Sequence, residues 1–372
     1  MQEQARTGSL GSEPDLRKVG LHPNFWYPLL VAKDLKKGKA IPVSFAGEPI
    51  VLVRTRSGKV YALEDRCAHR QMPLSFGVVT GERLKCCYHG WSYDELGRCA
   101  VPYLPDGTPP PHGVRAYPSR TAYGLIFVFP GDAALAERVP PPNLPLFHSN
   151  DYVTTGFSRQ IACHYSFVHE NLMDMNHQFL HRRWMGKFRP KLLAVRKGPD
   201  FVEVDYTFDS LEGIFGRLQH MTAMYGRPGK EPRAGEIGHR AEYDGDVMTV
   251  ATRYPYQSLT LHRPKLDGPL LQLWVAYVAA DREQRMTRSC GLLLIRKPAI
   301  RILAYPWRTF FRYFVDAIFE EDRFALEAEQ RAHDMQGADW NQEILPFILE
   351  LRALLVSAGI ATPTRVDLPA AS

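Results

Sequence analysis

Two cysteines and two histidines in the first third of the chain form two short pairs that could bind a metal. Cys67 and His69 make one pair, Cys86 and His89 make the other, and sixteen residues separate the pairs. Two thiolates and two imidazoles can hold either a zinc ion or a 2Fe-2S cluster. Because each pair supplies one cysteine and one histidine, one iron could take both thiolates and the other both imidazoles. The order therefore favours a one-electron cluster, with zinc as the alternative.

A second group of metal-binding residue types follows about ninety residues later. Glu170, Asp174, His177 and His181 would share one face of a helix predicted over residues 164–184. Two histidines four residues apart can bind one metal, and a further carboxylate would complete a 2-His-1-carboxylate set with positions open for dioxygen. The alternative for such a pair is a hydrogen-bonded couple on a polar helix face.

The third ligand must come from a distant part of the chain. Read as a helix, residues 311–329 place Asp322 on an apolar stripe and turn Glu320 and Glu321 away from it. We therefore predict Asp322 as the third ligand, although a solvated acidic helix face would look similar. Two other acidic residues of the same region are alternatives, Asp316 and Asp334.

The composition limits what the rest of the chain can be. With 372 residues, 45% of them hydrophobic and 23% charged, the chain can bury a core and is not a disordered protein. A net charge of +6 without long basic blocks argues against nucleic-acid binding. The first twenty residues are polar, and no stretch of eighteen uncharged apolar residues follows, which predicts no secretion signal and no transmembrane helix. We expect a cytoplasmic protein whose clustered cysteines hold metal.

The positions of Gly and Pro residues, which favour turns and linkers, divide the chain into four parts. We predict a polar leader, a small β domain, a Pro-rich linker and a larger domain, at residues 1–21, 22–131, 132–150 and 151–372. Apolar runs predict antiparallel strands in the larger domain, at 201–208, 247–254, 271–280 and 287–295. A loop or cap is predicted over 209–246, and helices in the last seventy residues, the final one ending at Gly359. The fold class is α+β.

The two metal-binding patterns resemble those of a known family. Cys-Ala-His-Arg at 67–70 with Cys-Cys-Tyr-His-Gly-Trp at 86–91 resembles the Rieske motif of the Rieske non-haem iron oxygenases. Asn-Leu-Met-Asp at 171–174, ahead of His177 and His181, resembles the mononuclear iron motif of the same family, and the run around Asp322 its third ligand. The two motifs also stand in the order that the family requires.

The resemblance implies the oxygenase (alpha) component of such an enzyme. It implies a small all-β domain holding a 2Fe-2S cluster and a larger, helix-grip-like domain of antiparallel sheet with helices holding mononuclear Fe(II). Dioxygen would be the co-substrate, with electrons from NAD(P)H passed on by a ferredoxin or flavin reductase, because the chain has no dinucleotide fingerprint of its own. The family also implies a homotrimer in which Asp174 lies between an iron-bound histidine and a cluster histidine of the neighbouring subunit.

The motifs and length are similar to monooxygenating members of the family, including vanillate-type O-demethylases and steroid hydroxylases. We therefore expect hydroxylation or oxidative demethylation of a hydrophobic small molecule (aromatic, steroid or terpenoid-like) in an apolar pocket between residues 200–295 and the helix carrying Asp322. The alternatives are ring cis-dihydroxylation and a Rieske electron-transfer protein without iron chemistry. The aromatic and basic stretch 298–319 predicts a pocket wall or, alternatively, a membrane-facing surface.

Overall fold

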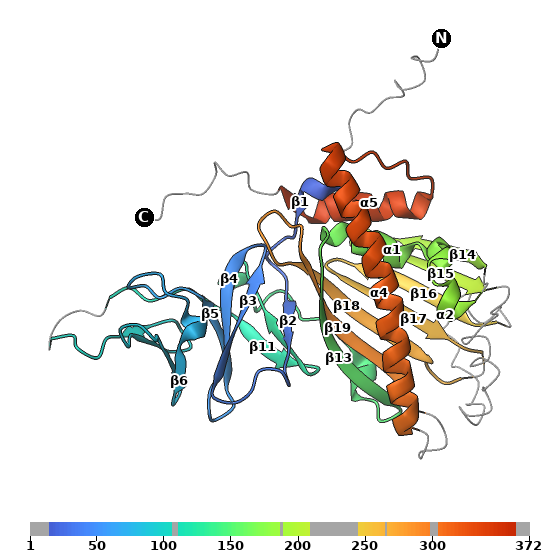
Figure 1. Ribbon diagram of the computed structural model, residues 1–372. Helices are drawn as coiled ribbons and strands as arrows, with labels where there is room; N and C mark the ends of the chain where they lie inside the picture. The colour runs from blue at the N-terminus through green and yellow to red at the C-terminus, as the bar shows by residue number, and fades with distance from the viewer. Residues whose placement is uncertain are drawn as a thin grey trace, which may run out of the picture.

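The computed structural model describes six parts of the chain: residues 15–105, 111–186, 189–208, 245–264, 266–297 and 304–361, the last with side chains from residue 313 onward. A small region of short strands lies beside a larger sheet, and a long helix crosses one face of that sheet (Figure 1). Residues 209–244 of the predicted loop 209–246 and most of the predicted leader lie outside the described residues. None of the helices in the described ranges is both long and apolar enough to cross a membrane.

The small region is built almost entirely of short strands. They form antiparallel sheets in the orders β10-β5-β4-β3, β11-β12-β2 and β6-β7-β8-β9. The bounds are β2 Tyr27–Val31, β3 Lys39–Phe45, β4 Glu48–Arg54, β5 Val60–Glu64, β6 Val78–Thr80, β7 Arg83–Lys85, β8 Ser92–Tyr93, β9 Cys99–Ala100, β10 Ala116–Tyr117, β11 Ser119–Ala122 and β12 Leu125–Val128, with single 3-10 turns η1 Leu16–Lys18, η2 Leu74–Phe76, η3 Ala133–Leu135 and η4 Pro145–His148. The expected all-β character is confirmed.

The larger region contains a seven-stranded antiparallel sheet in the order β13-β19-β18-β17-β16-β15-β14. Its strands are β13 Tyr152–Ile161, β14 Pro190–Lys197, β15 Phe201–Phe208, β16 Val247–Arg253, β17 Tyr256–His262, β18 Leu271–Ala279 and β19 Thr287–Arg296. The four strands predicted from apolar runs are β15, β16, β18 and β19. The edge strands β13 and β14, and β17, were missed, because their side chains are mostly only partly buried and carry little apolar signal.

Helices cover this sheet on one face (Figure 1). They are α1 Tyr165–Met173, η5 Met175–Phe179, α2 Arg182–Met185, α4 Ala304–Gln336 and α5 Pro346–Ala358. The single helix predicted over 164–184 is wrong, because Asp174 is extended (φ −92°, ψ 99°) and its carboxylate accepts from the backbone N–H of Asn176. Such local side-chain bonds compete with a continuous helix.

One apolar core runs through both regions. It joins Leu29 and Ile50 of the small sheets to Val275 of the large sheet and Leu351 of α5. Two short strands near the chain ends, β1 Val19–Gly20 and β20 Ile360–Ala361, pair beside it. The two regions are therefore held in one arrangement.

Candidate metal centres and the cavity beside them

The four cysteine and histidine candidates of the small region lie in two facing loops. Cys67 follows β5 and Cys86 follows β7, and both thiols are buried. The ring centroids of His69 and His89 are 4.5 Å apart, and the indole of Trp91 stacks on His69 at 4.8 Å. The Cys86 amide donates to the carbonyl of Trp91 at 2.7 Å, which closes the second loop. The structure thus brings together the two pairs that the sequence singled out.

The polar atoms of these loops are arranged as a 2Fe-2S cluster would require. Nδ1 of His69 is buried and has no hydrogen-bond partner among the described residues, which leaves this nitrogen available to bind an iron. Burial raises the pKa of the Cys86 thiol, and the neighbouring Cys67 adds to this, so a positive iron centre is what would keep the Cys86 sulfur ionised. Ala68 donates its N–H to the Tyr93 hydroxyl at 3.0 Å, which leaves that hydroxyl to donate to Cys67 Sγ at 3.2 Å.

The second group of candidates meets under α4. One ligand atom from each of His177, His181 and Asp322 lies within 4.8 Å of the others. Nε2 of His181 is 3.1 Å and Nε2 of His177 is 3.7 Å from Oδ1 of Asp322. Of the three acidic candidates from the sequence, Asp322 is therefore the one that meets both histidines. The two alternatives face elsewhere, Asp316 toward Arg159 and Asp334 toward Gln330.

Both imidazoles are held by their other nitrogen. Nδ1 of His177 donates to the backbone carbonyl of Asp174, and Nδ1 of His181 donates to Oε2 of Glu321 at 2.9 Å. These bonds leave both Nε2 atoms unprotonated in the neutral rings and directed at Asp322, which is what a metal ligand needs. The residues present therefore fit a mononuclear iron held by two histidines and one carboxylate.

The two histidines differ electrostatically. Burial lowers the pKa of His177, and the nearby Asp322 only partly opposes this. Burial also acts to lower the pKa of His181, but hydrogen bonds and charges from Asp322 and Glu321 outweigh it and raise that pKa. His181 is the more strongly anchored ring, with a side chain 4% exposed against 23% for His177.

Glu321 was expected to point away from the site, and that expectation is wrong. One helical step turns a side chain by only about 100°, so the neighbour of Asp322 lies on the flank of the stripe. A glutamate is long enough to reach His181 from there. Spacing alone gave no signal for this contact, because its partner lies 140 residues away.

Three residues near the histidines take separate roles. Nδ2 of Asn171 donates to Oδ1 of Asp322 at 3.5 Å, so Asn171 lies beside the candidate iron site. Glu170 instead forms ion pairs with Arg17 at 2.6 Å and with Arg352 at 2.5 Å, and braces α1. The carboxylate of Asp174 accepts from Asn176, while its backbone carbonyl accepts from His177. The prediction that residues 170, 174, 177 and 181 share one face of a helix is thus wrong.

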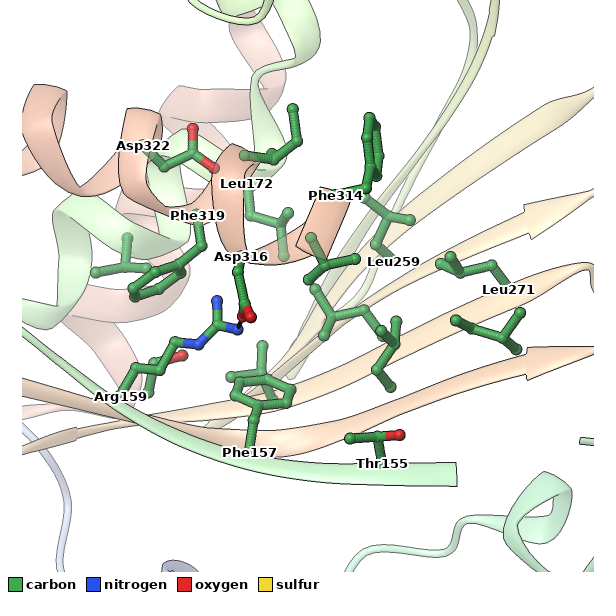
Figure 2. Close-up of a pocket in the computed structure, with 18 of the residues that line it drawn as sticks. Thr155, Phe157, Arg159, Leu172, Leu259, Leu271, Phe314, Asp316, Phe319 and Asp322 are labelled. Carbon is green, nitrogen blue, oxygen red and sulfur yellow. Dashed lines mark hydrogen bonds and ion pairs between the residues drawn. The ribbon is translucent and has the colours of Figure 1, made fainter. Parts of the chain in front are cut away.

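A cavity of about 580 Å³ opens beside this site. It lies between α4 and the strands β13, β17, β18 and β19, as expected, and its wall is mostly apolar (Figure 2). His177, His181 and Asp322 form part of the wall. Of the aromatic stretch 298–319, Phe314 and Phe319 line the cavity, which supports the interpretation as a pocket wall. The other aromatic residues of that stretch, apart from the exposed Tyr313, lie outside the described side chains.

Comparison with known families gives two matches that together cover most of the chain. The model of the Rieske [2Fe-2S] domain matches residues 25–118. The model of the vanillate O-demethylase oxygenase C-terminal domain matches residues 161–347, which is half of the chain. The first contains all four cysteine and histidine candidates, and the second contains His177, His181 and Asp322.

Individual proteins give the same picture. A 4beta-methylsterol monooxygenase of Methylococcus capsulatus is 30% identical over 355 residues, which are 91% of this chain and 89% of that protein. The oxygenase component of dicamba O-demethylase from Stenotrophomonas maltophilia is 34% identical over 161 residues, less than half of either chain. A crystal structure of dicamba monooxygenase bound to dicamba superposes with a TM-score of 0.71 at 20% identity, over 91% of this chain and 98% of that one, and shows the same fold.

Proposed function

The chain belongs to the Rieske non-haem iron oxygenases, and from this premise we propose that it inserts one oxygen atom into a large, mainly apolar polycyclic molecule of the sterol class. Membership itself makes the chain an oxygen-incorporating oxidoreductase with a 2Fe-2S cluster and a mononuclear iron, which hydroxylates or oxidatively demethylates a hydrophobic small molecule. The proposal concerns the substrate class, the residues that act and the assembly.

The observation that carries the substrate class is the size and lining of the cavity. A volume of about 580 Å³ is in the range of sites that enclose drug-sized ligands, and most of the wall is apolar. A single aromatic ring would leave much of this space unfilled and would gain little from it. The relative that matches along nearly its whole length is a methylsterol monooxygenase, which supports the same class.

We assign the metal-binding roles to the residues described above. Cys67, His69, Cys86 and His89 hold the cluster. His177, His181 and Asp322 hold the iron. When bound, the cluster would supply single electrons and the iron would supply dioxygen activation. The protein itself orients the metal ligands and excludes water. Glu321 fixes the ring of His181, and the apolar wall keeps water from the reacting carbon.

We propose that electrons cross from one subunit to the next in a homotrimer. In Figure 1 the β6 end of the small region and the α2 end of the large sheet lie on opposite sides of the molecule. The cluster loops adjoin β6 and the candidate iron ligands adjoin α2, so a single chain separates its two centres. Asp174, half-buried beside His177, is the residue we assign to the contact with a neighbouring cluster.

The electron donor is a separate ferredoxin or reductase, and we place the protein in the cytoplasm. None of the six cysteines forms a disulfide, including the exposed Cys87, which is typical of a reducing compartment. In the cytoplasm, NAD(P)H would be available as the electron source, and a donor protein would pass its electrons to the cluster.

Turnover under labelled oxygen tests the substrate class. The metal-loaded chain would be supplied with NADH, a reductase and a ferredoxin, and offered either a 4-methylsterol or a one-ring methoxybenzoate. We expect one labelled oxygen atom in the sterol product and little turnover of the one-ring compound. Turnover confined to the one-ring compound would contradict the proposal, and two labelled atoms would indicate dihydroxylation.

A further inference from the structure

The cavity wall contains a charged pair that is separate from the candidate metal ligands. Arg159 of β13 and Asp316 of α4 form an ion pair in which the guanidinium donates to the carboxylate. Figure 2 shows the two side chains reaching toward each other from the strand and the helix, on the side where the cavity lies. Their side chains are 23% and 45% exposed, so both can be reached by a molecule in the cavity.

The other charged residues of the wall, outside the metal ligands, lie at its edges. Lys33 and Asp34 are exposed in the turn after β2. Arg296 is the last residue of β19, and its guanidinium donates to the carbonyl of Asp267. Among the described residues of the wall, the Arg159–Asp316 pair is therefore the charged feature that lies between the edge strand β13 and the long helix.

The guanidinium of Arg159 is held in place by aromatic rings. Its central carbon lies 4.4 Å from the ring centroid of Phe319 and 5.7 Å from that of Phe157. Phe157 and Arg159 are two residues apart on β13, so they share the face that borders the cavity. Cation–π contacts on both sides restrict the rotamers of the arginine and preorganise its N–H groups.

Stability does not explain a charged pair at this place. Removing charges from water costs free energy that a partly buried ion pair recovers only in part, and an apolar pair of similar volume is often as stable. The neighbouring wall is apolar and could have continued across these two positions. Recognition of a polar group on the ligand is a role that a charged pair in an apolar wall can serve.

The pair lies too far along α4 to take part in the chemistry at the metal. Asp316 precedes Asp322 by six residues, which corresponds to about 9 Å along the helix axis. A bound molecule that contacts both positions therefore presents one part to the iron ligands and another part to Arg159. The two residues are specificity residues and not catalytic ones.

The chemistry of the pair selects the group that it would recognise. Arginine offers N–H donors and the aspartate carboxylate offers acceptors, and their charges largely cancel. A hydroxyl can accept from the first and donate to the second at once. A carboxylate could only accept, and it would meet the negative charge of Asp316.

We propose that the Arg159–Asp316 pair binds a hydroxyl group on the polycyclic substrate and discriminates against carboxylate-bearing molecules. This inference rests on the proposed function, since it assumes a large, mainly apolar substrate in the cavity. It adds the polar group that such a substrate must carry and the residues that recognise it.

Binding to the full, metal-loaded chain without reductant tests the inference directly. Calorimetry would compare a sterol alcohol, the same skeleton lacking the hydroxyl, and the same skeleton with a carboxylate in its place, each delivered from cyclodextrin. Hydrogen bonds to charged groups lead us to expect the alcohol to bind about tenfold more tightly than the deoxy compound, and the carboxylate to bind most weakly. Equal affinity for the alcohol and the deoxy compound would overturn the inference.

Two variants separate the roles of the partners. Asp316→Asn removes the repulsion and leaves the arginine, so affinity for the carboxylate should rise about tenfold. Arg159→Gln removes the cation, and the preference for the alcohol over the deoxy compound should disappear. Glu137→Gln is the matched control, because it breaks the exposed Arg120–Glu137 pair outside the cavity and should change none of these affinities. Unchanged carboxylate binding in Asp316→Asn would also overturn the inference.

Failure of the inference and failure of the proposed function give different results. If the unaltered chain binds and oxygenates both the alcohol and the deoxy compound equally well, the substrate class stands and the role of the pair is refuted. If it binds none of the three skeletons, the substrate class itself is wrong and the inference falls with it. Retention of the bound mononuclear iron, together with the cluster's visible absorption, would show that each variant has folded.

Discussion

The two candidate metal centres are assembled from the chain in opposite ways. All four cluster residues lie between positions 67 and 89, on two neighbouring loops of the small sheets. The iron site takes His177 and His181 from one segment and Asp322 from a helix far along the chain. The first centre is therefore fixed by local hairpins, and the second depends on how α4 packs on the large sheet.

The surroundings of the two centres also differ. His69 and His89 are only partly buried, and the exposed Tyr88 lies next to them, so another protein can approach the cluster. The candidate iron ligands line an apolar cavity, where His181 is almost fully buried and His177 and Asp322 are partly buried. Electron transfer needs access for a partner, whereas oxygen chemistry needs exclusion of water. The comparison teaches that the two centres differ in what their histidines face: the protein surface at the cluster loops, and an apolar cavity at the candidate iron site.

The largest effect should come from removing an iron ligand. His177→Ala should abolish turnover, because one of three protein ligands is lost, while the visible absorption of the cluster stays unchanged. Metal analysis and the absorption spectrum check this. Bleaching of the cluster in the variant would mean that the two centres are not independent, and would break the comparison.

Asp174→Asn tests whether the two centres communicate through this residue. Asparagine can still accept from the Asn176 N–H, so the local turn should persist. We expect both metal centres to remain and the turnover rate to fall by about a hundredfold, the upper range for residues that orient a ligand. Single-turnover oxidation of the reduced cluster measures this step, and an unchanged rate would exclude the residue from the electron route.

Glu321→Gln sharpens the contrast on the iron side. Loss of the carboxylate that accepts from His181 should weaken iron binding about tenfold, and the cluster should be unaffected. Glu320→Gln is the matched control, because Glu320 is exposed and pairs with Arg323. Iron titration of both variants gives the result, and equal affinities would remove Glu321 from the site.

Acid should destabilise the large region through two buried histidines, one at the N-cap of α1 and the other in the middle of that helix. Burial lowers the pKa of both His164 and His169 to about 3, below their ordinary 6.5. The unfolded chain takes up a proton on each below pH 6.5, but the folded chain does so only near pH 3. Their contribution is thus complete above pH 6.5 and is lost as the pH falls toward 3, by about 1.4 kcal/mol per pH unit for each histidine.

Urea unfolding at pH 7 and pH 5 measures this loss, which should reach about 4 kcal/mol for the two histidines together. In His169→Phe, which keeps a ring against Tyr277, the loss between the two pH values should be about half as large. An equal pH dependence in the variant and the unaltered chain would contradict the assignment.

The smallest effect concerns the cluster side. Tyr93→Phe removes the hydroxyl that donates to Cys67 Sγ, a bond that favours the reduced, more negative cluster. A bond of about 1 kcal/mol corresponds to a potential lower by about 40 mV. Redox titration followed by visible absorption measures the shift, and a potential that stays the same or rises would show that this bond does not tune the cluster.

The sequence predicted most of what is local. The cysteine and histidine pairs, the strands with continuous apolar runs and the apolar stripe around Asp322 were all readable, because each signal lies within one segment. Gly359 was correctly predicted to end the last helix, but for a different reason. A side chain there would come within 2.4 Å of Val19, so the close approach of β1 and not a left-handed turn requires the glycine.

What the sequence could not give depends on contacts between distant segments. Glu321 meets His181 only because the tertiary fold brings α4 to the turn that carries His181. Glu170 contacts Arg17 and Arg352 because η1 and α5 pack together beside α1. The break at Asp174 was hidden because its capping bond competes with a helix that the residue pattern also allows. Contacts between distant side chains, and competition between a capping bond and a helix, leave no periodic pattern in the sequence.

The candidate iron site depends on Arg17, a residue far from it in the sequence. Its buried guanidinium lies over Phe167 and binds Glu170, which directly precedes Asn171 beside Asp322. A protease that clipped the chain after η1 would remove this brace although the cut is far from any ligand in the sequence. Loss of iron with an intact cluster would then report damage at the chain's beginning.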